Sequence, residues 1–99
     1  MSVVKDNIVI GEIDLLNYTG EANSFVRVFA TDDFRVKGVH VQIEDEQNQT
    51  VETGFAMQEE NSDWWKFIVS ETHALPAGSK VVVTASDLPG NETVKEAVL

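Results

Sequence analysis

The residues of this sequence that could do chemistry are carboxylates gathered at turns and two histidines, His40 and His73. No serine or carboxylate stands at a spacing that would complete a catalytic triad with either histidine. Adjacent Glu59 and Glu60 could act as acid and base only in an apolar pocket that separates their pKa values, and the sequence indicates none. The chain has no cysteine, which excludes thiol nucleophiles, thiolate metal sites and disulfides. These patterns predict a protein that is not an enzyme.

The elements that must position these residues are short β-strands. No segment of useful length has helical periodicity, whereas seven runs have the composition or the alternation of a strand. They cover about residues 7–16, 24–31, 36–45, 50–57, 64–70, 80–86 and 92–98. Short strands separated by polar, turn-rich links are typical of a two-sheet antiparallel sandwich. We therefore expect an all-β fold that forms a single domain over residues 1–99.

Two of these strands do not have a simple pattern. In the first, Ile8 and Ile10 share one face but Ile13 shares the other, which predicts a bulge or kink near Gly11. In the fourth, two inward sets compete, and we favour the larger residues over the smaller. The larger set is Val51, Thr53, Phe55 and Met57, and the smaller set is Gly54 and Ala56.

A short pattern, V-x-V-x-A-[ST]-D, occurs twice, at Val26 to Asp32 and at Val81 to Asp87. Because alternate side chains of a strand share a face, the two valines and the alanine of each copy point the same way. We predict that these strands face each other across the core, with Ala30 opposite Ala85. Asp32 and Asp87 would then emerge at the same end of the molecule.

With the strands placed, the chain resembles the bacterial immunoglobulin-like modules of surface and secreted multidomain proteins. The resemblance rests on ATDD from Ala30, VKGVHVQIED from Val36, ETGFAM, Trp65-x-Phe67, LPAG and VTASDLPGN up to Asn91. It implies a seven-stranded immunoglobulin-like β-sandwich that acts as a spacer, adhesive unit or accessory domain beside a protein partner or neighbouring domain. The chain lacks the paired cysteines of antibody domains, and Ser79 or Lys80 stands where a fibronectin-like module places its corner tyrosine.

In that strand order the loops after the second, fourth and sixth strands lie at one end, which would gather several acidic side chains. The candidate ligands are Asp32, Asp33, Asp63 and Asp87. Ca²⁺ takes about six to eight oxygen ligands, and carboxylates with backbone carbonyls supply them. The alternative is that these residues only cap their turns, since no calcium-loop motif is present. We expect no other cofactor.

The same strand order makes the second and fifth strands neighbours, so their outward side chains would form one patch. The patch consists of Phe25, Arg27, Phe29, Trp64, Lys66 and Ile68. Aromatic rings among cations on an acidic protein are typical of a binding surface for a carbohydrate, a neighbouring domain or a second subunit. Two alternatives stay open: a terminal segment covers this face, or a bulge reverses the parity and buries Trp64 in place of Trp65.

The charge and hydropathy of the chain narrow the partners further. A formal net charge of −10 without a dense basic patch argues against nucleic acid. No stretch is apolar enough to span a bilayer, and the first sixteen residues lack the apolar core of a signal peptide. The chain is therefore either cytoplasmic or a domain cut from a longer secreted protein, and the resemblance favours an extracellular or cell-surface location.

Overall fold

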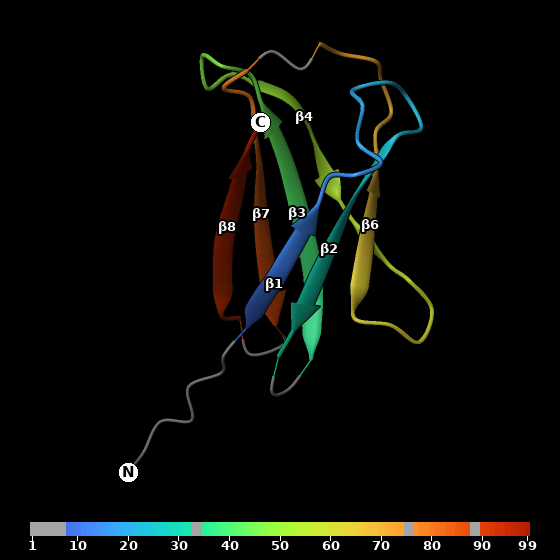
Figure 1. Cartoon of the computed structure of the whole chain (residues 1–99). Coiled ribbons are helices and arrows are strands. Elements are labelled where there is room, and N and C mark those ends of the chain that lie inside the picture. The colour runs from blue at the N-terminus through green and yellow to red at the C-terminus, as the bar shows by residue number, and fades with distance from the viewer. Residues whose placement is uncertain (1–7, 33–34, 75–76, 88–89) are drawn as a thin grey trace.

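The computed structural model describes residues 8–32, 35–74, 77–87 and 90–99, and it is an all-β structure in which every strand pairing is antiparallel. Two four-stranded sheets lie in two layers with the arrangement of a β-sandwich (Figure 1). One sheet has the order β1 (Val9–Asp14), β2 (Phe25–Thr31), β6 (Trp64–Ile68) and β5 (Met57–Gln58). The other has the order β4 (Thr50–Phe55), β3 (Val36–Glu44), β7 (Lys80–Asp87) and β8 (Glu92–Val98). Within the described ranges no helix occurs, and so none that could cross a bilayer.

The predicted all-β fold of two antiparallel sheets is confirmed, but the prediction of seven strands is wrong, because the described residues form eight. The difference lies in the predicted fourth strand, which divides at Ala56. The Ala56 N–H donates to the Val39 carbonyl at 2.8 Å, so Ala56 still bonds to β3. The next residue, Met57, pairs with Lys66 of the opposite sheet. One continuous run of sequence therefore changes sheets at this residue.

The inward face predicted for the fourth strand is also wrong. Phe55 and Met57 are 72% and 77% exposed, and Ala56 is buried. The reason is the space available beside the core: a Cβ atom added to Gly54 would lie 3.0 Å from the Phe67 ring. Only small residues fit beneath that ring, so the large side chains face outward.

The core is built from the alternating valines that the sequence pattern predicted. Val26, Val28 and Ala30 of β2 and Val81, Val83 and Ala85 of β7 are fully or almost fully buried, from opposite sheets. Each buried valine removes enough apolar surface from water to stabilise the fold by roughly 1.5–3 kcal/mol before entropy losses. The predicted irregularity of the first strand is confirmed by a register shift between Ile10 and Glu12.

One lateral side of the sandwich is closed by side chains. The Thr93 hydroxyl of β8 donates to the Ile8 carbonyl at 3.0 Å, and the Lys95 ammonium donates to the Ile10 carbonyl at 3.3 Å. These bonds satisfy backbone groups at the edge of β1, which would otherwise be open to pairing with another chain. The opposite lateral side of the sandwich lies between β4 and β6.

Candidate functional site

The acidic end of the molecule is organised around Asp87, which is fully buried at the end of β7. Its Oδ1 accepts hydrogen bonds from the backbone N–H groups of Gly90 at 3.0 Å and Asn91 at 2.8 Å, and its Oδ2 accepts from the Asn91 amide at 3.3 Å. Asp32 shares a further hydrogen bond with it. The predicted meeting of Asp32 and Asp87 at one end is therefore confirmed.

These contacts determine the charge state of Asp87. Burial raises the pKa of its carboxyl, but the hydrogen bonds from Asn91 and Gly90 and the contact with Asp32 outweigh burial and hold the pKa below its ordinary value. An ionised carboxylate that accepts two backbone N–H groups of the following turn is a loop cap.

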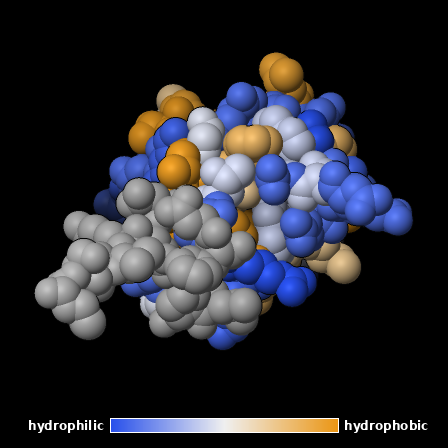
Figure 2. Space-filling view, turned by 90° about the horizontal axis from the view of Figure 1, so that it is seen from below, coloured by the Kyte–Doolittle hydropathy of each residue, from blue (hydrophilic) through white to orange (hydrophobic). Residues whose placement is uncertain are grey.

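Asp32 and Asp63 line a hollow of about 240 Å³ at this same end, and Arg35 lines it with them. A guanidinium beside the two carboxylates competes with any bound cation. Seen from below, the described residues show hydrophilic side chains mixed with hydrophobic ones (Figure 2). Asp33 lies outside the described residues, and among those described no group of three or more histidine, aspartate or glutamate side chains could hold a metal ion. The calcium site stays a prediction.

The structure brings the six residues of the predicted aromatic patch together on the outer face of β2 and β6. They form three cross-strand pairs: Phe25 with Ile68, Arg27 with Lys66, and Phe29 with Trp64. Trp65 is buried and Trp64 is half-buried, so the reversed parity that would bury Trp64 is wrong.

Within this patch, which we call the aromatic ladder, the rings and cations contact one another. The Arg27 guanidinium lies 4.3 Å from the centre of the Trp64 ring, and the Lys66 ammonium lies 4.5 Å from that of Phe25. Phe29 meets Trp64 edge to face at 5.2 Å. Each cation contact is worth about 0.5–1 kcal/mol at such an exposed position. One face of the Trp64 ring and one face of the Phe25 ring thus already carry a cation of the protein itself.

Glu59 holds Arg27 in place over Trp64. Two hydrogen bonds, of 2.8 and 2.9 Å, join the Arg27 guanidinium to the two Glu59 carboxylate oxygens. The bond to Glu59 raises the pKa of Arg27, and the same bond lowers the pKa of Glu59. A bidentate pair of this kind fixes the orientation of the guanidinium.

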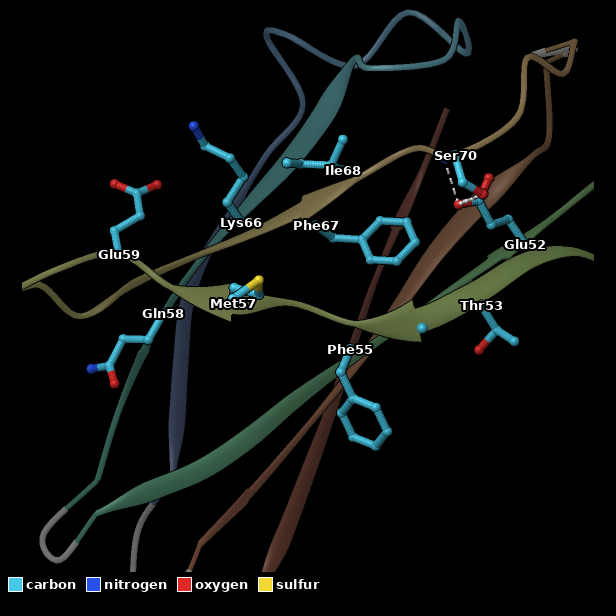
Figure 3. Close-up of a pocket in the computed structure, with 11 residues that line it drawn as sticks. Glu52, Thr53, Phe55, Met57, Gln58, Glu59, Lys66, Phe67, Ile68 and Ser70 are labelled. Carbon is cyan, nitrogen blue, oxygen red and sulfur yellow. Dashed lines mark hydrogen bonds between the residues drawn. The ribbon is translucent and has the colours of Figure 1, made fainter.

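A groove of about 480 Å³ lies between β4 and β6, on the side of the sandwich that is not closed by β8. Its walls include three exposed apolar side chains, Phe55, Met57 and Ile68. Phe67 points from β6 toward β4, whereas Phe55 points away from β6 (Figure 3). Glu52 and Glu59 lie toward opposite ends of the groove. We call this groove and its exposed residues the open seam.

Sequence reasoning missed most of the open seam. Ile68 was expected to face outward, but Phe55 and Met57 were assigned to the core. The small residues Gly54 and Ala56 were the signal that could have corrected this, because their alternation marks the face that must fit against a packed ring.

No family model, curated protein or solved structure matches this chain.

The two histidines take part in separate polar contacts. His40 bonds the Thr53 hydroxyl at 2.8 Å and meets the Phe55 ring edge to face at 5.1 Å. His73 Nδ1 lies 3.0 Å from the Glu71 carbonyl, which can only accept, so Nδ1 carries a proton. In neutral His73 the other ring nitrogen then accepts from the Tyr18 hydroxyl at 2.7 Å.

The carboxylate of Glu52 lies beside this second contact. Its Oε2 accepts from the Ser70 N–H at 2.9 Å, and its Oε1 lies 3.9 Å from His73 Nδ1. Burial, and secondly the negative charge of Glu52, raises the pKa of Tyr18 to about 12. The cluster joins the loops that follow β1 and β6, which fits a structural role.

Proposed function

We propose that this chain is a non-catalytic, immunoglobulin-like interaction module that acts by contact with a protein partner or neighbouring domain. The strand orders β1-β2-β6-β5 and β4-β3-β7-β8 support the immunoglobulin-like part of the proposal. They correspond to the A-B-E-D sheet of that fold and to its C-F-G sheet, extended by one strand beside C.

The observation that carries the interaction role is the open seam. Phe55, Met57 and Ile68 are 72%, 77% and 56% exposed, and all three line one groove. Large apolar side chains gathered around a groove are typical of surfaces that bind another macromolecule. The opposite side of the sandwich, by contrast, is closed by the Thr93 and Lys95 bonds.

The aromatic ladder supports a carbohydrate site less well. Stacking of a sugar requires a free ring face, and the Trp64 and Phe25 rings already carry Arg27 and Lys66. The ladder is better suited to stiffening the sheet from which the open seam is built.

The resemblance to modules of surface and secreted proteins leads us to extend the proposal to an extracellular or cell-surface location. Cell fractionation of the source organism, with the chain detected by antibody, tests this part. Recovery only in the cytoplasmic fraction would contradict it.

A photo-cross-linking experiment tests the interaction role. A photoreactive residue is placed at Phe55 or at Ile68, and as a control at Val94, which is 61% exposed on β8. After irradiation in the source cells, we expect one discrete cross-linked partner from the two seam positions and none from position 94. Equal labelling from all three positions, or none from the seam, would refute the proposed role.

A further inference from the structure

We propose that the open seam takes up an extended, basic segment of a partner protein, which adds to β4 as a further strand. The inference rests on the proposed function and names the class of partner.

The backbone of β4 is arranged to accept such a strand. The Ala56 N–H bonds the Val39 carbonyl, and Phe55 lies opposite His40 and Thr53 opposite Gln42 in the ladder with β3. Because antiparallel partners alternate between bonded and non-bonded pairs, the N–H and C=O groups of Thr53 and Phe55 point away from β3. Among the described residues no strand pairs with that edge.

The facing strand leaves room for the segment. β5 has two residues, and it pairs only with Lys66 and Trp65 of β6. Continuing the same register would place Phe55 beside Ile68, but the chain has already passed to the other sheet at Ala56. On the side of β6 away from β2, no described strand pairs with Ile68. The groove occupies this place.

The side chains of the seam suit a segment with alternating apolar residues. A strand added at β4 would direct every second side chain into the groove, against Ile68 and Met57, which are the exposed apolar groups on its β5–β6 wall. Figure 3 shows Ile68 on β6, across the groove from β4, and Met57 on the short stretch of chain that continues from β4. Main-chain bonds would supply affinity and the apolar contacts would set the register.

The net charge of the chain favours a basic segment over an acidic one. Glu52 and Glu59 line the groove, and Lys66 is the only cation among its described lining residues. All three charges already have partners within the chain, since the Lys66 ammonium lies over an aromatic ring, Glu59 binds Arg27 and Glu52 accepts from Ser70. The chain as a whole carries a formal charge of −10, which attracts cationic partners and repels a second copy of itself.

The test uses synthetic seven-residue peptides and the isotope-labelled protein. One peptide alternates lysine and valine, a second replaces the central valine by proline, and a third replaces every lysine by glutamate. We expect only the first to bind, with amide shifts at Thr53, Phe55 and Ile68 in NMR spectra. The Thr53 and Phe55 amides should also become protected from hydrogen exchange.

A matched pair of variants separates backbone pairing from side-chain contact. Thr53→Pro removes an N–H that points to the open edge, where proline is tolerated, and it should weaken binding at least tenfold. Thr53→Val loses the hydroxyl bond to His40 but keeps the N–H, and it should bind like the wild type. If Thr53→Pro does not fold, amide protection in the wild type decides alone.

Three results would overturn the inference: no binding of the lysine peptide at millimolar concentration, equal binding of the glutamate peptide, or binding without protection of Thr53 and Phe55. None of them affects the photo-cross-linking test, since a folded partner could still be captured at Phe55. Failure of the strand-addition inference and failure of the interaction role are therefore distinguishable.

Discussion

At the scale of single residues, two buried polar side chains hold the loops at the two ends of the sandwich. Asp87 caps the turn after β7, and Tyr18 joins the loop after β1 to His73 at the other end (Figure 1). Each is a group whose ionisation differs between the folded and unfolded chain, so pH should report on both.

The pKa of Tyr18 is raised in the folded chain to about 12, against about 10 for an exposed tyrosine. Its contribution to stability is therefore complete below about pH 10 and is lost as pH rises toward 12. Tyr18 is the only tyrosine, so the ultraviolet absorbance of tyrosinate reports it directly. We expect a midpoint near 12 for the folded protein and near 10 in concentrated urea.

Tyr18→Phe provides the control for this titration. The melting temperature of the variant should no longer decline between about pH 10 and 12 because of this group. At neutral pH its free energy of unfolding should be lower by about 0.5–1.5 kcal/mol, the usual range for one hydrogen bond. A tyrosinate titration midpoint near pH 10 in the folded protein would contradict the burial of Tyr18 and its bond to His73.

Asp87 should act in the opposite pH range. Its folded pKa is lowered, so its contribution is present above the unfolded value of about 3.9 and is lost as pH falls through the folded value. Asp87→Asn should lower the melting temperature at pH 7 and flatten its decline as pH falls below about 4. Parallel declines in the wild type and the variant would contradict the capping role.

At the scale of elements, the decisive feature is the change of sheet at Ala56. The chain leaves β4 with Phe55 outward and enters β5 two residues later, so neither strand pairs with Phe67 and Ile68 at the end of β6. The same crossing brings Gly54 against Phe67 and exposes Phe55 and Met57. The groove is thus a direct result of where the crossing falls.

Two glycines give a matched test of this packing. A Cβ at Gly54 would lie 3.0 Å from the Phe67 ring, but one at Gly38 would lie 3.7 Å from its nearest neighbour, the Ser86 hydroxyl oxygen. Gly54→Ala should therefore cost about 1 kcal/mol or more through overpacking. Gly38→Ala should be neutral or slightly stabilising. Urea unfolding measures both, and equal effects would refute the packing argument.

At the scale of the whole molecule, the two lateral sides of the sandwich differ. β1 and β8 are joined by side-chain bonds to the Ile8 and Ile10 carbonyls, so this edge is protected against pairing. On the side formed by β4 and β6, the Glu52 carboxylate bonds Ser70 at one end of the groove, and the exposed apolar side chains Phe55, Met57 and Ile68 lie along the rest of it. If the proposed interaction role holds, this asymmetry would direct partners to one side.

Opening the closed side should reduce both stability and solubility. Thr93→Val keeps the shape of the side chain but removes the hydroxyl that bonds Ile8, which should cost about 1 kcal/mol in urea unfolding. Size-exclusion chromatography should show more self-association than for the wild type. Thr93→Ser retains the hydroxyl, so it should behave like the wild type in both measurements.

The sequence by itself determined the all-β class, the approximate strands and the faces of the regular strands. Alternation in β2, β3 and β7 favours one choice of buried face, because a shift of one residue would expose the buried pairs Val26 and Val28, Val39 and Val41, and Val81 and Val83. The aromatic ladder could be predicted from the parity of β2 and β6 together with the strand order that the resemblance implies, whereas the choice between Trp64 and Trp65 stayed open until the structure showed Trp65 buried.

Only the tertiary structure decided where the chain changes sheets and what closes each side. The inward choice of Gly54 depends on the Phe67 ring, 13 residues later in the sequence, and the bond from Thr93 to Ile8 joins residues 85 positions apart. Such contacts depend on distances across the folded molecule, which the period of a strand does not contain. The open seam is formed by contacts of this kind, and for that reason strand patterns alone did not reveal it.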